Sequence, residues 1–149
     1  MSLTTINTGL TTALLNLDGY ARLGKGQVSD INKYSERDKP LYWWVIPYTE
    51  SLGNINSQNR YIEGHPISIY VVDQDDLPST PDDSFVIIET CEALAQKLLM
   101  HIYEYFEGDL QAEITSATIQ HVIKMAAQNN YTGVVLRLTI SLPNTETIC

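Results

Sequence analysis

The segment YTGVVLRLTISLPN, residues 131–144, places the strongest constraint on the fold. Every second residue from Val134 to Leu142 is apolar, and the residues between them are mostly polar. Because neighbouring side chains of a strand point to opposite faces, this segment predicts a strand with one apolar and one mostly polar face. Pro143, which cannot donate to a strand ladder, is expected to end it. Another part of the chain must cover the apolar face, and the polar face must meet water or another molecule.

A long amphipathic helix that begins at Pro81 is the best candidate to cover the apolar face. Thr80 is a suitable cap, proline fits the first turn, and Asp82 and Asp83 lie near the positive end of the helix dipole. Apolar residues then recur every three or four positions until Gly108, which is expected to end the helix. These positions are Phe85, Ile88, Cys91, Leu94, Ala95, Leu98, Leu99, Ile102 and Tyr105. Such a helix of about 26 residues spans roughly 40 Å.

The rest of the chain supplies a second helix and three more strands. A short N-terminal helix is predicted by apolar residues at helical spacing, namely Leu3, Ile6, Leu10, Leu14 and Leu17. Dense β-forming residues predict a strand in LYWWVIP (Leu41–Pro47), and alternation predicts another in PISIYVVDQDD (Pro66–Asp76). AEITSATIQHVIKMAAQ (Ala112–Gln128) predicts one strand, or two short ones, ending near Met125 and followed by a turn.

These elements predict an α+β fold with a single domain over residues 1–149. The connecting segments Asp18–Pro40 and Tyr48–Gly64 are rich in glycine or polar residues and are expected to be irregular. Strands joined by hairpins pair antiparallel, so the element order predicts a sheet of about four antiparallel strands. The long helix and the short N-terminal helix are expected to pack on one face of that sheet.

The charge balance argues against tight binding of nucleic acid. The chain has 18 acidic and 9 basic residues and a formal net charge of −9, whereas affinity for DNA or RNA comes mainly from Lys and Arg at the phosphates. Hydrophobic residues make up 44% and charged residues 18%, as in ordinary globular proteins. No apolar run approaches the roughly 20 residues that span a bilayer, and the N-terminus lacks the pattern of a signal peptide. We therefore expect synthesis in the cytoplasm and no membrane partner.

No motif for catalysis, cofactor binding or metal binding stands out. His65, in a predicted loop, His101, in the long helix, and His121, in a strand, belong to no zinc-binding pattern. His101 and Glu104 are expected to form a surface pair. The glycine motifs that bind phosphates or dinucleotides, or that present a nucleophilic serine, are missing. We therefore expect a protein that is not an enzyme and has no catalytic residues, cofactor or metal.

The acidic sequence DQDD, residues 73–76, does not match a calcium-binding loop. Pro78 and Ser84 occupy the places where that loop needs glycine and glutamate. We interpret residues 73–76 as a solvated acidic loop. The two cysteines are too few for a disulfide framework: Cys91 is expected to be a small buried side chain of the long helix, and Cys149 is the last residue.

Trp43 and Trp44 are adjacent in a predicted strand, so they point to opposite faces. One of them is expected to lie in the core. The other lies either beneath the N-terminal helix or on an exposed contact surface, where tryptophan is enriched. The sequence leaves both alternatives open.

Three phrases, taken in order, resemble small virion proteins of tailed bacteriophages. GKGQVSDINKYSERDKPLYWWVIP is similar to their pattern of SDIN, polar residues and a strand that ends in proline. PISIYVVDQDD, with the long helix after it, resembles their second strand and helix. NNYTGVVLRLTISLPNTETIC resembles their closing pattern of polar turn, glycine, alternating strand, proline and cysteine, although Val134 stands where a tryptophan is expected.

The resemblance, which covers most of the chain from about Gly24 onward, is to tail terminators and tail-completion proteins. Such proteins are α+β subunits that form rings, often of six copies, between the head connector and the tail tube. The resemblance implies a structural virion protein that forms a hexamer or larger ring with its own copies and contacts neighbouring neck and tail proteins. The genome would pass through the lumen without specific binding, which a net negative subunit would favour.

In such a ring, the polar strand face and the polar loop 49–60 are expected to contact neighbouring copies or to line the channel. The candidate contact residues are Trp43, Trp44, Asn54, Asn56, Gln58, Arg60 and Arg137. Two alternatives from other classes stay open. One is a non-viral α+β binding or adaptor module that recognises a partner through loop 49–60 and one tryptophan. The other is an enzyme whose site matches no familiar motif.

Overall fold

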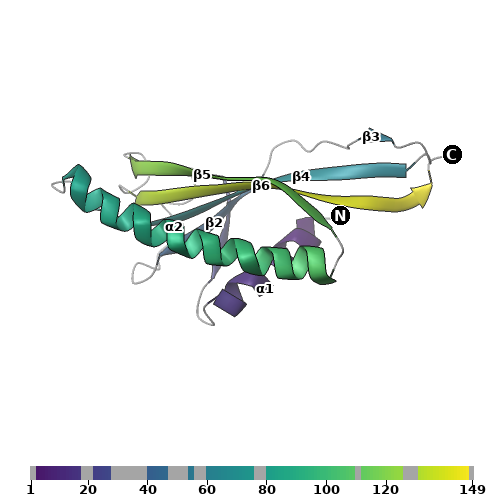
Figure 1. The fold of residues 1–149 in the computed structure, drawn as a ribbon, viewed down its shortest axis with the longest axis horizontal. Helices are drawn as coiled ribbons and strands as arrows, with labels where there is room; N and C mark the ends of the chain where they lie inside the picture. The colour runs from purple at the N-terminus through teal and green to yellow at the C-terminus, as the bar shows by residue number, and fades with distance from the viewer. Residues whose placement is uncertain are drawn as a thin grey trace.

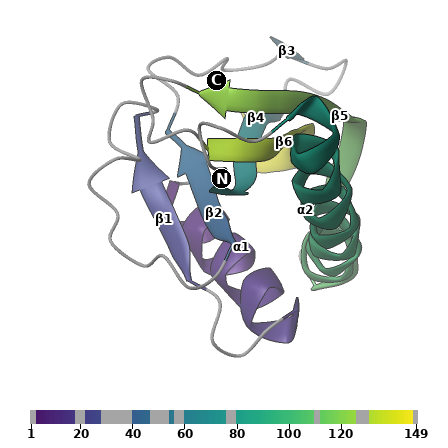
Figure 2. The same cartoon turned by 90° about the vertical axis from the view of Figure 1, so that its left-hand side faces the viewer.

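The computed structural model describes residues 3–17, 22–27, 40–46, 54–55, 60–75, 80–109, 112–125 and 131–147. These residues form two helices and a mixed sheet, and both helices lie on the same side of the sheet (Figure 1 and Figure 2). The predicted α+β class, with its helices on one face, is therefore confirmed. Within the described residues, neither helix combines the length and the apolar character that crossing a bilayer requires.

Helix α2 (Pro81–Tyr103) begins as predicted. The Thr80 hydroxyl accepts a hydrogen bond from the backbone N–H of Asp83, and the Asp83 carboxylate accepts one from the backbone N–H of Thr80 at 2.9 Å. A π-helical segment, η2 (Glu104–Asp109), continues the helix past the predicted residues and includes Gly108. Phe85 is an exception to the predicted apolar face, because it is 48% exposed and the buried position of this turn is taken by Ser84.

Helix α1 (Leu3–Leu17) confirms the predicted N-terminal helix. It buries Ile6, Leu10 and Leu14 in the core that it shares with α2 and the sheet. Gly9 allows α1 to approach the end of α2, because a Cβ at this position would overlap the Phe106 ring. Leu17, the last of the predicted apolar residues, is only partly buried against this core.

The sheet contains one main strand more than predicted. Its order is β1 (Leu23–Gly26), β2 (Leu41–Val45), β4 (Arg60–Gln74), β6 (Tyr131–Thr147) and β5 (Glu113–Met125), and the two-residue β3 (Asn54–Ile55) pairs with β4. β2, β4, β6 and β5 pair antiparallel as predicted, whereas β1 pairs parallel to β2. The main path of the sheet therefore has five strands and is mixed.

β1 lies in a segment that the sequence predicts to be irregular. Its sequence LGKG has no β-branched residue and no alternation, so the strand is formed by tertiary contacts. The N–H of Ile46 donates to the carbonyl of Gly26 at 3.0 Å, and Gly24 lies opposite Trp43 in the register. A Cβ on Gly24 would overlap the Trp43 ring, so glycine is needed for β1 to come this close.

β4 and β6 are longer than predicted and form a ribbon that extends past the end of the helices (Figure 1). In this ribbon Arg60 pairs with Thr147 and Ile62 pairs with Pro143. Part of Tyr48–Gly64 is therefore a strand, and Pro143 does not end β6. Proline is tolerated there because the pairing with β5 ends opposite Ser141, so that β6 is an edge at this point.

The apolar face of β6 is buried as predicted. Val134, Leu136, Leu138 and Ile140 pack in the main core with residues of both helices and with Ile67, Ile69 and Val71 of β4. The same register turns Arg137 and Thr139 to the other face of the sheet. The long helix therefore covers the apolar face, and the polar face is available for a different role.

β5 forms the edge of the sheet next to β6 and is irregular in two places. Its register with β6 shifts between Thr115 and Thr118 and again between Val122 and Met125. At the first shift Ser116 has a φ of 57°, a left-handed conformation that non-glycine residues seldom adopt. Both shifts are β-bulges, which increase the local twist of an edge strand.

Candidate functional site

The face of the sheet that points away from both helices is the main candidate site. Its rows follow from the strand register: one contains Ser68, Arg137 and Thr118, and the next contains Tyr70, Val135 and Gln120. We call these six residues the outer sheet face. Arg137 and Gln120 are exposed, and the guanidinium of Arg137 donates a hydrogen bond from Nη1 to Oε1 of Gln120. This surface offers hydroxyl, amide and guanidinium groups on a broad sheet.

Charge is divided unevenly between the helix layer and the six residues of the outer sheet face. Residues 81–109, which form α2 and η2, contain seven acidic residues and one lysine. The two rows of the outer sheet face contain Arg137 and no acidic residue. A subunit with an acidic side and a face that carries a cation is suited to contact a second copy through unlike surfaces.

Both tryptophans are buried, on opposite faces of the sheet as predicted. Trp44 belongs to the main core and lies beside α1, whereas Trp43 belongs to a small second cluster with Leu41, Val72 and Tyr131 on the outer side. Trp43 is thus neither beneath the N-terminal helix nor exposed, because its ring lies over Gly24. A direct role of either residue in contacts with a partner stays a prediction.

The predicted residues of loop 49–60 are not brought together with Arg137 in the described part of the chain. Asn54 lies in β3, and Arg60 is the first residue of β4, but their side chains lie outside what the structure describes. Asn56 and Gln58 also lie outside the described residues. Gln120 is a residue that sequence reasoning missed. The only available signal was its alternation with Ile119 in the predicted strand.

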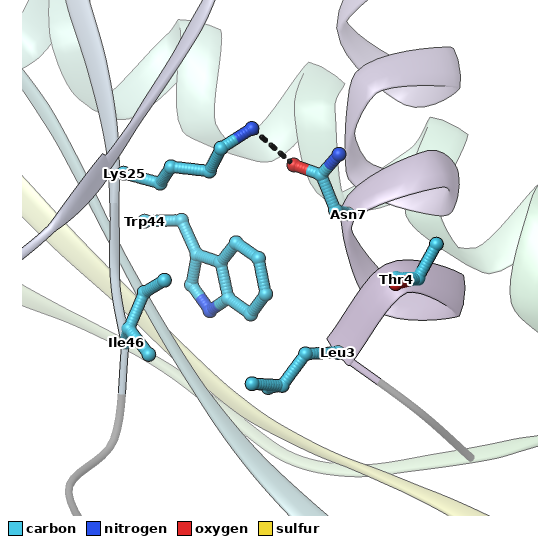
Figure 3. Close-up of a pocket in the computed structure, with 6 residues that line it drawn as sticks. All are labelled: Leu3, Thr4, Asn7, Lys25, Trp44 and Ile46. Carbon is cyan, nitrogen blue, oxygen red and sulfur yellow. Dashed lines mark hydrogen bonds between the residues drawn. The ribbon is translucent and has the colours of Figure 1, made fainter.

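A shallow cavity of about 290 Å³ lies between α1 and the first two strands. It is lined by Leu3, Thr4, Asn7, Lys25, Trp44 and Ile46 (Figure 3). At its rim the ammonium group of Lys25 donates to Oδ1 of Asn7 at 3.1 Å. The Trp44 side chain is 1% exposed, and its indole N–H, which points toward Leu3 and Ile46, finds no acceptor among the described residues (Figure 3). A buried donor without an acceptor costs free energy.

A second buried polar group joins three elements at one end of the sheet. Asp75 is 4% exposed, and its Oδ2 accepts hydrogen bonds from Ser84 Oγ at 2.6 Å and from Thr132 Oγ1 at 2.8 Å. The interpretation of residues 73–76 as a solvated loop is therefore wrong for Asp75. Its carboxylate connects the end of β4 to the first turn of α2 and to the start of β6, which is a positioning role.

The histidines are spread over different parts of the fold. His101 Nδ1 lies 3.1 Å from Glu104 Oε2, the surface pair that the sequence predicts. His121 of β5 approaches α2, with Nε2 at 3.7 Å from Glu92 Oε2. His65 is not in a loop but in β4, where it is buried. In the part of the chain that the structure describes, no three His, Cys, Asp or Glu side chains converge in a way that would hold a metal.

Cys91 is buried in the core, as predicted from its apolar neighbours. Burial, together with the nearby carboxylate of Asp73, raises the pKa of its thiol from 9.0 to about 12. Because the thiolate is the nucleophilic form, this cysteine is an inert core side chain at neutral pH.

Comparison with known proteins assigns no family to this sequence. The chain matches no protein-family model and has no significant match among curated proteins.

Proposed function

We propose that this chain is a structural virion protein of a tailed bacteriophage, a tail-terminator or tail-completion subunit that forms a ring of six or more copies. The observation that carries the proposal is the outer sheet face, on which Arg137, Gln120 and Thr118 are exposed on the side opposite an acidic helix layer. The order of the sequence phrases and the α+β fold are consistent with such subunits. The ring would join the head connector to the tail tube and contact neighbouring neck and tail proteins.

A subunit with two different contact surfaces forms a ring when the first surface of each copy binds the second surface of the next. The ring closes if the rotation between neighbouring copies divides a full turn evenly. In the proposed ring the outer sheet face of one copy contacts an acidic surface of its neighbour, and Arg137 supplies the complementary charge. The formal net charge of −9 per copy keeps the passing genome from adhering to the wall. Catalysis plays no part in this role.

The mass of the protein in solution over a range of concentrations tests this proposal. We expect oligomers larger than a dimer for the native chain and their loss in Arg137→Glu. Lys97→Glu makes the same change of charge on α2, so it should keep these oligomers. Thermal melting of both variants checks that the fold is intact. A native chain that never exceeds a dimer, either alone or when mixed with neck and tail proteins, contradicts the proposed ring.

The position in the virion has an independent test. Genes for portal, capsid and tape-measure proteins beside the gene for this chain support the proposal. Detection of the chain in purified phage particles, by mass spectrometry of the virion proteins, supports it further. Absence of the chain from such particles contradicts it.

One observation favours a second candidate function, that of a binding or adaptor module. The cavity beside α1 places the ammonium group of Lys25 next to the apolar side chains of Leu3, Trp44 and Ile46, which suits an apolar ligand with a carboxylate. A set of small apolar carboxylates is the appropriate probe, and Trp44 fluorescence is the readout. Saturable quenching that is lost in Lys25→Ala supports the binding module. The absence of quenching across the set argues against it.

A further inference from the structure

The side of α2 that faces solvent carries large apolar side chains that the fold leaves uncovered. Val86 is 65% exposed and Met100 is 63% exposed. Ala93, which is also exposed, lies seven residues from each of them, so all three are on the same side of the helix. The stripe from Val86 to Met100 is about 21 Å long at a rise of 1.5 Å per residue.

The charged residues beside these positions are arranged symmetrically about Ala93. Glu89 lies four residues before Ala93 and Lys97 lies four residues after it, and both are exposed. Consider two copies of α2 that cross antiparallel at Ala93. A residue that lies a given number of positions before Ala93 in one copy then lies beside the residue the same number of positions after Ala93 in the other copy. Glu89 of one copy then meets Lys97 of the other, twice, and Val86 meets Met100, also twice.

We propose that two copies of this chain associate through α2, with the helices antiparallel and a two-fold axis at Ala93. The α2 stripe that makes the contact consists of Val86, Glu89, Ala93, Lys97 and Met100. Glu89, Ala93 and Lys97 form a row with a spacing of four, and rows of this kind interdigitate when two helices cross at about 50°. The small side chain of Ala93 at the crossing point allows a close approach of the helix axes.

The same geometry keeps like charges near the ends of the stripe apart. Asp82 and Glu104 are eleven residues before and after Ala93, so they lie at the same height in the pair. At that distance, about 16 Å along each axis, a crossing angle of about 50° separates the helices sideways by roughly 14 Å. Because one helix contact is smaller than the ~1,600 Å² of a standard interface, we expect a weak dimer that depends on concentration.

This inference goes beyond the proposed ring and does not rest on it, because Arg137 and the other residues of the outer sheet face take no part in the α2 contact. The contact is closed by its own symmetry, and it uses the acidic helix layer that the ring contact also needs, so it gives dimers of free subunits. The outer sheet face of each copy stays accessible in such a dimer.

Charge reversal tests the contact between Glu89 and Lys97. We expect Glu89→Lys and Lys97→Glu each to weaken the dimer at least tenfold in sedimentation equilibrium, because each change places two pairs of like charges at the crossing. The double variant with both substitutions should recover native affinity. Arg137→Glu is the matched control and should leave the dimer unchanged. Equal affinities for the native chain and all charge variants, or no recovery in the double variant, overturn the proposal.

Cysteine cross-linking tests the position of the axis and detects a weak dimer. In a Cys149→Ser background, which removes the cysteine at the chain end, Ala93→Cys should form a disulfide dimer under mild oxidation because this residue meets its own copy. Val86→Cys and Met100→Cys are controls, since each lies about 21 Å from its own copy in the antiparallel pair. All three positions are exposed, so the substitutions leave the core intact. Equal cross-linking at all three positions, as a parallel pair would give, or no cross-linking at Ala93→Cys, refutes the proposed arrangement.

Discussion

Asp75 is the residue on which the relative placement of three elements depends. Its carboxylate is buried and accepts hydrogen bonds from Ser84 and Thr132, at the points where α2 and β6 begin. Hydrogen bonds to a buried charged group contribute more than those between neutral groups, because the donors otherwise stay unpaired away from water. Loss of this carboxylate would therefore destabilise the start of α2 and the start of β6 at the same time.

We expect Asp75→Ala to lower the free energy of unfolding by about 3 kcal/mol, since two buried hydroxyls lose their acceptor. Asp73→Ala is the matched control. Asp73 is only partly buried and accepts from the adjacent backbone N–H of Gln74 at 2.8 Å, so its loss should cost much less. Denaturant unfolding followed by circular dichroism measures both changes. Equal losses in the two variants would show that Asp75 has no special role.

The raised pKa of Cys91 makes a pH-dependent contribution to stability. The unfolded chain loses the thiol proton above the ordinary pKa of 9.0, whereas the folded chain retains it until about 12. This contribution is fully present below pH 9 and decreases as the pH rises toward 12. In the Cys149→Ser background, Cys91→Ala should therefore lose less stability than its parent between pH 9 and 11. At pH 8 a thiol reagent should label the parent only after unfolding, and rapid labelling of the folded protein contradicts the burial of Cys91.

At the scale of elements, the first turn of α2 is held by polar contacts. The reciprocal hydrogen bonds between Thr80 and Asp83 satisfy donors that the start of a helix leaves unpaired. Ser84 adds the contact to Asp75 one residue later. Two independent polar contacts therefore set where this helix begins and how it meets the sheet.

Thr80→Ala should lower the free energy of unfolding by about 1 kcal/mol, because the helix loses its cap. Thr90→Ala is the control for the same chemical change within α2. The Thr90 hydroxyl donates back to the Val86 carbonyl at 3.0 Å on an exposed surface, and alanine has the higher helix propensity. This control should be neutral or slightly stabilising in thermal unfolding. If the two variants destabilise equally, the cap does not act as the geometry indicates.

The sequence predicts best those elements whose own residues carry the pattern. The spacing of Ile6, Leu10 and Leu14 and the alternation along β6 are local and strong, and the structure agrees with them. β1 could not be predicted in this way, because each of its residues pairs with a residue of β2 that lies nineteen positions further along the chain. Asp75 was misjudged for the same reason, since one of its partners, Thr132, is 57 residues away. At the candidate site, alternation was enough to place Arg137 on the outer face, but its contact with Gln120 depends on the register of a second strand.

At the scale of the whole molecule, the distribution of charge decides how copies meet. Each copy carries a formal net charge of −9, and the acidic residues are concentrated along α2 and η2. Two copies therefore repel at long range, whereas the proposed contact of Glu89 with Lys97 would attract at short range. Salt weakens the long-range repulsion at lower concentrations than the short-range attraction, because screening acts first on charges that are far apart.

We expect self-association to increase when ionic strength rises from about 10 mM to about 150 mM, where the Debye length shortens from about 30 Å to about 8 Å. Above roughly 1 M it should decrease again, because contacts between unlike charges are then screened as well. Sedimentation velocity at a fixed protein concentration measures this dependence, with a neutral solute of equal osmolality as the control. Association that is strongest at the lowest salt would contradict this account of the charge distribution.

The two bulges of β5 restrict the ways in which copies of this protein can add to one another. A flat, regular edge strand would accept the edge of another chain and continue the ladder, which is the route to fibrils. The register shifts at Thr115–Thr118 and Val122–Met125 interrupt the spacing of free N–H and C=O groups along that edge. The bulges therefore disfavour the addition of further copies through backbone hydrogen bonds at this edge. Copies then associate through side-chain contacts, which can limit an assembly to a fixed number of subunits.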